Sequence, residues 1–295
     1  MIKKTNNAIG AERQFKIINF IGRWQYATQK TLALNLKIPQ EAISKNLKSL
    51  ISQKLIIQKT DDTFSQKFYV LTDFGKSERI AKISENVEKY PILQADLERA
   101  EQDYKAKAQE INPILIKHNI SLQEFLPQIL QILEENNVEN PNFYLTEREQ
   151  SVALRNKINS KIYDLVIDVE VAKNQNQDTT PHRQKLTAER QKLKSLKAKY
   201  ADLLVNRVAV EFERTLKKDK DLDQMLLHYA TNNNIKQVFI FSKSSLNPYH
   251  NAIQGKIRNW VYNPTERRFK PVENIYLTPE QKSKFKLIKL GAKNV

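Results

Sequence analysis

Residues 28–54, TQKTLALNLKIPQEAISKNLKSLISQK, contain two apolar stripes at helical spacing, separated by a short turn that ends in Pro39. Threonine is a favourable N-cap, so Thr28 predicts a first helix, which ends near Leu36. Proline is favoured at the first position of a helix, so a second helix is predicted over residues 39–54. One face of that helix carries the apolar side chains Ile43, Leu47, Leu50 and Ile51, all of which are expected to be buried. The stretch therefore predicts two helices joined by a tight turn.

The flanking sequence extends this pattern on both sides. Residues 11–22, AERQFKIINFIG, have apolar positions at helical spacing and predict a preceding helix. Two β-like runs follow, LIIQK at 55–59 and KFYVLT at 67–72, joined by the polar segment TDDTFSQ. A Leu-Thr-x-x-Gly segment closes the second run at Gly75. Helix, helix, turn, helix and hairpin in this order predict a winged helix-turn-helix domain over residues 1–80.

Such a domain binds double-stranded DNA by placing one helix, here the one predicted over residues 39–54, in the major groove. The N-terminal residues of that helix then lie at the base edges. Glutamine can read adenine, and lysine reaches guanine or phosphate. Backbone N–H groups at the start of the preceding helix can hold a phosphate. The alternative is a three-helix module that only packs against other parts of the protein and has solvated lysines. The predicted DNA contacts are Thr28, Gln29, Lys30, Gln40, Ser44, Lys45, Lys48, Lys59 and Lys67.

Charge is unevenly distributed along the 295 residues, whose formal net charge is +16. Residues 1–80 carry 14 basic and 6 acidic side chains, whereas residues 81–150 carry 7 basic and 13 acidic ones. The chain becomes basic again from residue 151 onward. A basic balance favours a polyanionic partner, and the uneven pattern places that partner at the two ends of the chain.

The remaining sequence predicts a helical middle followed by a mixed α/β domain. Residues 81–142 are expected to form charged helices that act as a linker or a dimerisation region, with a homodimer as one consequence. Capping-box patterns predict helix starts at Ser121 and Thr146. Beyond these, a basic helix is predicted over 181–199. The apolar run KQVFIFS is typical of a buried parallel strand.

The rest of the C-terminal region predicts further strands and a helix. Residues 215–234 predict an amphipathic helix with Leu222, Met225, Leu226 and Tyr229 on its apolar face. The stretch RNWVYNPTERRFKPV predicts strands on either side of an Asn263-Pro264 turn. Residues 143–295 are therefore expected to form an α/β domain with a mixed sheet, and the whole chain an α+β or α/β protein.

An acidic cluster lies within ADLLVNRVAVEFERTLKK, residues 201–218. Glu211 and Glu213 share one face of a predicted strand, and Asp202 lies on the strand before it. Three carboxylates in one place can hold Mg²⁺ or Mn²⁺ through oxygen ligands. Such ions activate water and stabilise a phosphate under attack. The alternative is that the carboxylates only form ion pairs, with Arg207 and Arg214 as partners.

The stretch KYADLLVNRVAVEFERTLKK, together with the following helix and QVFIFS, resembles the plasmid replication-relaxation family, which includes the mobilisation protein C type. The resemblance covers residues 10–75 and 145–265. It implies an N-terminal winged helix and a C-terminal domain similar to the PD-(D/E)xK, or restriction-endonuclease-like, nuclease fold. By that resemblance Asp202 and Glu211 match the two metal-binding acids. Glu213 occupies the position of the family's lysine, and Lys217 would reach back from the next helix as a migrated lysine.

The resemblance implies an accessory protein that binds a plasmid origin in double-stranded DNA and assists mobilisation, relaxation or replication. Its protein partner would be a relaxase or a replication initiator. Two alternatives stay open: a metal-dependent nuclease that uses Asp202, Glu211, Glu213 and Lys217, or a transcriptional repressor. The accessory protein is the leading hypothesis, and it requires no cofactor; Mg²⁺ or Mn²⁺ belongs to the nuclease alternative alone. Since no apolar run approaches membrane-spanning length, no membrane partner and a cytoplasmic location are expected.

Overall fold

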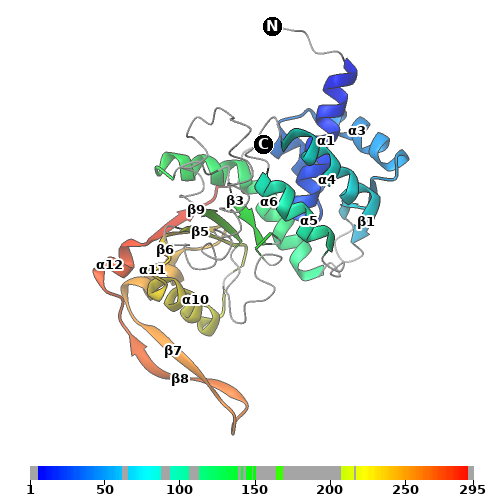
Figure 1. Cartoon of the computed structure of the whole chain (residues 1–295). Coiled ribbons are helices and arrows are strands. Elements are labelled where there is room, and N and C mark those ends of the chain that lie inside the picture. The colour runs from blue at the N-terminus through cyan, green and yellow to red at the C-terminus, as the bar shows by residue number, and fades with distance from the viewer. Residues whose placement is uncertain are drawn as a thin grey trace, which may run out of the picture. The chain divides into compact units, whose positions relative to one another are not determined.

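The computed structural model describes residues 6–61, 66–87, 94–105, 113–138, 141, 144–147, 149–150, 164–168, 207–215 and 217–291. The chain divides into two compact units. Unit 1 comprises Met1–Ile132 and Leu145–Ile162, and unit 2 comprises Leu133–Tyr144 and Tyr163–Val295. Helices and sheets both contribute to the fold, so the predicted mixture of α and β structure is confirmed (Figure 1).

Unit 1 begins with three helices, α1 (Asn6–Trp24), α2 (Gln29–Leu36) and α3 (Gln40–Ser52). Thr28 caps α2 as predicted, and Pro39 occupies the N-cap position of α3. Three members of the predicted α3 stripe are buried: Ile43, Leu47 and Leu50.

The fourth predicted member of that stripe, Ile51, is 39% exposed, so its assignment to the core is wrong. Ile51 lies in the last turn of α3, and residues 51–54 are all exposed. The helical period alone does not show that the core ends one turn before the helix does.

The predicted hairpin is confirmed as β1 (Ile56–Asp61) paired antiparallel with β2 (Gln66–Leu71). A third short stretch of backbone joins the same sheet. Ala27 and Tyr69 exchange two backbone hydrogen bonds, of 3.2 and 2.8 Å, and form an antiparallel bridge. The segment between α1 and α2 is thereby fixed to the hairpin.

The Leu-Thr-x-x-Gly segment after β2 ties the hairpin to the end of α3. The Thr72 hydroxyl donates a hydrogen bond of 2.7 Å to the Lys54 carbonyl oxygen, and it accepts one of 2.9 Å from the Gly75 N–H. A Cβ atom at Gly75 would lie 1.9 Å from the Leu55 carbonyl oxygen. Only glycine fits this close backbone approach, which explains the residue type at that position.

Three further helices follow in the chain: α4 (Asp73–Val87), α5 (Gln94–Lys105) and α6 (Pro113–Glu135). The predicted helix start at Ser121 is wrong, because α6 begins at Pro113 and Ser121 is buried within it. Its Ser-x-x-Glu pattern therefore lies inside a helix rather than at its cap. The α6 residues Ile116 and Ile120 complete a small apolar core with Tyr26, Phe68 and Val70.

The larger sheet has five strands in the order β3–β4–β5–β6–β9. Strand β4 is antiparallel to β5, whereas β5, β6 and β9 run parallel. The predicted mixed sheet is thus confirmed, with QVFIFS as a buried parallel strand. The strands are β3 (Tyr144–Thr146), β4 (Leu165–Asp168), β5 (Arg207–Glu213), β6 (Ile235–Ser242) and β9 (Phe285–Lys289).

Three helices accompany these strands: α10 (Asp219–Thr231), α11 (Asn247–Gln254) and α12 (Pro279–Ser283). Helix α10 buries its predicted apolar face, which consists of Leu222, Met225, Leu226 and Tyr229. These side chains share one core with the apolar residues of β6 and with Tyr249 and Ile253 of α11. The core fixes where the ends of β5 and β6 lie relative to α10 and α11.

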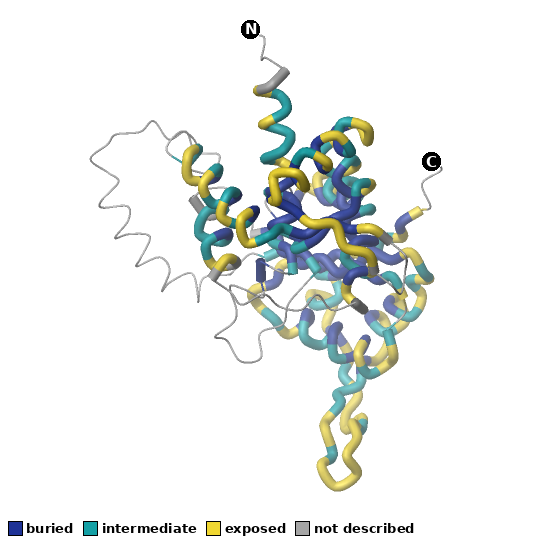
Figure 2. The backbone as a smooth tube through the Cα atoms, turned by 90° about the vertical axis from the view of Figure 1, so that its right-hand side faces the viewer, coloured by how far each residue is buried: buried dark blue, intermediate teal, exposed yellow. Residues whose placement is uncertain are grey.

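Unit 2 also contains a two-stranded antiparallel sheet, which pairs β7 (Ile257–Asn263) with β8 (Arg268–Ile275). It matches the strands predicted on either side of the Asn263-Pro264 turn. This hairpin is long and mostly exposed, whereas the buried residues of the chain are concentrated elsewhere (Figure 2).

Candidate nucleic-acid interface and buried acidic cluster

The face of α3 opposite its buried stripe is polar and basic. Lys45 and Lys48 are exposed, as is Gln40 at the first turn, and Ser44 lies between them. The acidic Glu41 is exposed in the same first turn. This set is called the α3 surface below, and it consists of Gln40, Glu41, Ser44, Lys45 and Lys48.

The predicted contacts at the start of α2 have intramolecular partners. Thr28 is 4% exposed, and its hydroxyl accepts a hydrogen bond from the Thr31 N–H in a capping box. The Gln29 side-chain amide donates to the Gln40 carbonyl oxygen over 3.2 Å. Lys30 pairs with Glu124 of α6 at 3.0 Å. Exposed ion pairs of this kind are worth little and exchange readily with other anions, so Lys30 can still reach a phosphate.

The two predicted hairpin lysines are exposed on adjacent strands. Lys59 of β1 pairs in register with Phe68, and Lys67 of β2 pairs with Thr60. Both side chains face solvent, whereas Phe68 is buried in the small core that includes Tyr26. Burial of the aromatic ring thus fixes the strand that presents Lys67.

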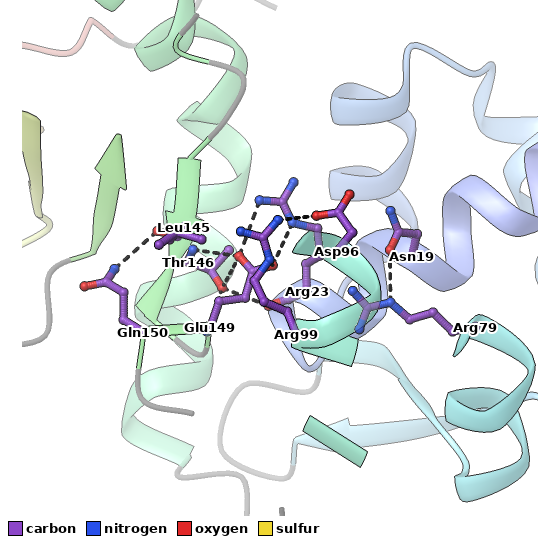
Figure 3. Close-up of polar contacts among 9 residues, drawn as sticks. All are labelled: Asn19, Arg23, Arg79, Asp96, Arg99, Leu145, Thr146, Glu149 and Gln150. Carbon is purple, nitrogen blue, oxygen red and sulfur yellow. Dashed lines mark hydrogen bonds and ion pairs between the residues drawn. The ribbon is translucent and has the colours of Figure 1, made fainter. Parts of the chain in front are cut away.

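A buried ionic cluster within unit 1 fixes the C-terminal end of α1 (Figure 3). Arg23 donates from Nε to Glu149 Oε1 over 3.0 Å and from a terminal nitrogen to Oε2 over 3.3 Å. Arg99 of α5 lies beside the same carboxylate, with its Nε 3.9 Å from Oε1. The Thr146 hydroxyl donates to the Arg23 carbonyl oxygen over 2.9 Å. We call Arg23, Arg99, Thr146 and Glu149 the arginine–glutamate cluster.

The arginine–glutamate cluster confirms the capping box predicted at Thr146. The Thr146 N–H donates to Glu149 Oε2, and the Glu149 N–H donates to Thr146 Oγ1. Burial alone would raise the pKa of Glu149, but the charges of Arg23 and Arg99 outweigh it, and the pKa is lowered. The two arginine partners were not predicted, since residues so distant in sequence carry no local signal of their pairing.

A second buried cluster lies where β5 ends. Glu211 and Glu213 are 5% and 4% exposed, on the same face of β5. Lys217 pairs with Glu213 at 2.5 Å, and the Tyr229 hydroxyl of α10 donates to Glu211. Asp164, next to β4, accepts a hydrogen bond of 2.5 Å from the Phe212 N–H. We call Asp164, Glu211, Glu213, Lys217 and Tyr229 the acidic cluster.

Three carboxylates and one ammonium group set the electrostatics of the acidic cluster. Burial raises the pKa of Glu213, an effect that Lys217 opposes and that Glu211 and Asp164 reinforce. Burial lowers the pKa of Lys217, but Glu213, Glu211 and Asp164 together outweigh it, and that pKa is raised. Burial also raises the pKa of Tyr249 from α11, and the negative charge of Glu213 raises it further. The cluster thus holds more carboxylates than it has cations.

The predicted metal site is only partly visible. Asp202 lies outside the described residues, as do the predicted strand 201–205 and the basic helix 181–199. Among the residues that the structure describes, no three acidic or histidine side chains are grouped so as to hold a metal ion. Glu213 is engaged by Lys217 and Glu211 by Tyr229. One oxygen of each glutamate therefore already contacts a protein donor, which favours a structural role over a metal site.

Sequence reasoning brought together Glu211, Glu213 and Lys217, and the structure places all three in one cluster. It missed Asp164 and Tyr229. Asp164 directly precedes the apolar run Leu165–Asp168, and an acid at the start of a buried strand is a usable signal. Tyr229 carried no such signal, because its helical spacing assigned it only to the core.

None of the helices in the described part of the chain is long and apolar enough to cross a membrane. No family model, no curated protein and no solved structure matches the chain significantly.

Proposed function

We propose that the chain is a double-stranded DNA-binding protein whose residues 1–80 form a winged helix. The observation that carries this proposal is the α3 surface. Lys45 and Lys48 project from a helix whose opposite side is anchored by Ile43, Leu47 and Leu50. A helix presented in this way has the dimensions that the major groove admits.

Further support comes from the parts around α3. An isolated antiparallel bridge between Ala27 and Tyr69 joins the segment before α2 to the β1–β2 hairpin, which supports a winged-helix arrangement. The hairpin presents Lys59 and Lys67 to solvent, where they would contact phosphates on either side of the groove. Phosphate contacts position a protein on the duplex, whereas base contacts from the α3 surface would supply sequence preference.

The biological role proposed here is accessory: binding a plasmid origin and assisting mobilisation, relaxation or replication there. It rests on the resemblance of the sequence to the plasmid replication-relaxation family and on the basic ends of the chain. A relaxase or a replication initiator is the proposed protein partner, and unit 2 is the proposed part that recruits it. A transcriptional repressor would use the same α3 surface and differs only in where its site lies.

The test is selection of preferred duplexes from a random library, followed by gel shifts with the full chain. Lys45→Ala with Lys48→Ala is expected to weaken binding to the selected duplex at least 10-fold, on the order of 1–3 kcal/mol per lost base contact. Lys16→Ala with Lys82→Ala removes the same charge from α1 and α4 and is the matched control. Equal binding by both double variants would refute the proposal.

A nuclease is the second candidate, favoured by one observation: three carboxylates and Lys217 gather at the end of β5. Their existing partners argue for a structural role instead. Incubating the full chain with supercoiled DNA and Mg²⁺ or Mn²⁺ separates the two. Cleavage that Glu211→Gln abolishes would establish the enzyme, and Asp202→Ala tests the remaining predicted ligand.

A further inference from the structure

We propose that the β7–β8 hairpin is a second DNA-binding element, which enters a groove of duplex DNA separately from α3. The hairpin, called the ribbon below, spans residues 257–275 and projects from the rest of unit 2 (Figure 1). The proposal rests on the proposed function only in that both name the same partner, duplex DNA.

The ribbon exposes apolar side chains that have no core to cover. Val261 is 50% exposed and Val272 is 61% exposed, and Tyr262 and Phe269 are 49% and 39% exposed. A two-stranded hairpin by itself is at best marginally stable in water. These exposed apolar side chains, on both faces of the ribbon, are open to contact with a partner.

The charges of the ribbon select an anionic partner. Its distal half, Val261–Pro271, carries Arg267, Arg268 and Lys270 against the single acid Glu266. Arg268 pairs with Glu266 at 2.7 Å, and Lys270 pairs with the same carboxylate. One acid shared by two exposed cations leaves an excess of positive charge at the tip, where Arg267 adds to it.

The two faces of the ribbon differ. Tyr262 and Phe269 are cross-strand partners whose ring centroids lie 5.4 Å apart, and Lys220 of α10 lies 3.9 Å from the Phe269 ring centroid. This face is therefore turned toward α10. The opposite face carries Val261 directly across from Lys270, and Arg268 follows at the same pleat. We call Val261, Arg268 and Lys270 the cationic face.

The base and the tip of the ribbon are both held in place. Asp223 of α10, whose side chain is 4% exposed, accepts hydrogen bonds from Arg258 Nε at 2.7 Å and from Trp260 Nε1 at 2.9 Å. At the tip the Asn263 side-chain oxygen accepts from the N–H groups of Thr265 and Glu266. A ribbon that is fixed to α10 at its base and has an ordered turn at its tip loses less conformational freedom when it binds.

Duplex DNA is the partner that combines these features. The major groove admits a two-stranded ribbon, phosphates line both of its walls, and thymine methyl groups offer apolar contacts for valine. A single strand would instead require open aromatic faces for base stacking. Here the edge-to-face contact between Tyr262 and Phe269, and Lys220 over the Phe269 ring, occupy part of these aromatic faces, which favours the duplex.

The experiment compares the full chain with Arg267→Gln plus Arg268→Gln, using a fluorescein-labelled duplex of random sequence and, separately, oligo(dT). Affinity is measured by fluorescence anisotropy over a salt series. We expect the duplex affinity of this ribbon variant to fall about 10-fold at low salt, with a salt slope smaller by about 2. Lys236→Gln plus Lys286→Gln removes two exposed lysines from β6 and β9 and should bind like the wild type.

Each outcome separates this inference from the proposed function. If the ribbon variant binds like the wild type while Lys45→Ala plus Lys48→Ala loses binding, the ribbon inference is overturned and the α3 proposal stands. The reverse result overturns the α3 proposal and supports the ribbon. A loss confined to oligo(dT), an equal loss in the lysine control, or no duplex binding by the wild type also overturns the inference. Circular dichroism checks that the exposed substitutions leave the fold intact.

Discussion

Glu149 in unit 1 and Glu213 in unit 2 are both buried glutamates with a basic partner, yet their pKa values shift in opposite directions. Burial raises the pKa of each, because it penalises the charged form. At Glu149 two arginines outweigh burial, whereas at Glu213 one lysine does not, since two further carboxylates lie nearby. The difference therefore comes from the ratio of cations to acids and not from burial.

That ratio distinguishes a structural ion pair from a candidate site. The arginine–glutamate cluster satisfies its single carboxylate with a two-point arginine contact and a capping box. The acidic cluster gathers three carboxylates around one lysine, so the carboxylates repel one another in the folded state. Carboxylates with perturbed pKa values gather at functional sites, so the acidic cluster is the stronger candidate of the two.

The largest effect is expected for Glu149→Ala, which removes the buried carboxylate and leaves the partly buried Arg23 without its anion. Removing one partner of a buried pair costs about 3–5 kcal/mol. The sequence contains 2 tryptophans, Trp24 in unit 1 and Trp260 in unit 2, so fluorescence of a Trp260→Phe background reports unit 1 alone. Urea unfolding measures the loss. Glu85→Ala, an exposed control on α4, should cost little, and a similar small loss for Glu149→Ala would contradict the buried pair.

A smaller loss is expected for Lys217→Met, because Lys217 is partly exposed and its cluster has carboxylates in excess. Leaving a buried acceptor without its partner costs about 1–3 kcal/mol. Urea unfolding in a Trp24→Phe background reports unit 2. The neighbouring exposed Lys218 provides the matched control, Lys218→Met. Adding Glu213→Gln to Lys217→Met should recover part of the stability, because it removes the repulsion between Glu213 and the carboxylates of Glu211 and Asp164. A further loss of stability would show that this repulsion does not destabilise the folded state.

The two units should respond to pH with opposite signs. Glu149 has a lowered pKa, so its contribution is fully present above the unfolded value of about 4.3 and is lost as the pH falls through the folded value. Glu213 has a raised pKa, so unit 2 loses stability as the pH rises from about 4.3 through the folded value. Each effect is at most about 1.4 kcal/mol per pH unit.

The measurement is urea unfolding of each unit between about pH 3 and 7, on both sides of the unfolded glutamate value of about 4.3. Subtracting Glu149→Gln from the wild type isolates one titration, and subtracting Glu213→Gln isolates the other. If the difference in unfolding free energy between wild type and variant changed with pH in the same direction in both units, the predicted contrast between Glu149 and Glu213 would be wrong.

The smallest effect is expected for Arg99→Gln. The Nε of Arg99 lies 3.9 Å from Glu149, and the side chain is 30% exposed, so solvent screens the pair. A cost of about 0.5–1 kcal/mol is typical of such pairs. A double-mutant cycle with Glu149→Gln measures the coupling directly. A coupling as large as that of Arg23 would mean that the two arginines contribute equally.

Much of the fold was predictable because its signals are local. The capping residue Thr28, the turn at Pro39 and the apolar period of α3 each act within a few residues, and these predictions were confirmed except at Ile51, which is exposed. The apolar strand β6 and the amphipathic helix α10 were found for the same reason. The pattern at Ser121 misled because a Ser-x-x-Glu spacing also occurs inside helices, where the cap is not needed.

The residues of the candidate sites also divide into those that lie close together in the sequence and those that only the packing brings together. Glu211, Glu213 and Lys217 lie within residues 211–217, close together in the sequence, and were grouped from their spacing. Asp164 joins them only because β4 pairs antiparallel with β5, which brings Leu165 opposite Val210. No spacing rule connects residues so far apart in the chain. The exposure of the ribbon was equally hidden, since alternating apolar residues normally predict a strand with one buried face.

The sequence by itself determined the order of helices and strands, the basic surface of α3 and the pair of glutamates on β5. These follow from periods, caps and turns that act over a few residues. Only the tertiary structure decided which carboxylates have cations: Arg23 and Arg99 meet Glu149, whereas Glu213 shares Lys217 with Glu211 and Asp164. The physical reason is that charge interactions depend on distance in space, which the packing of distant segments sets.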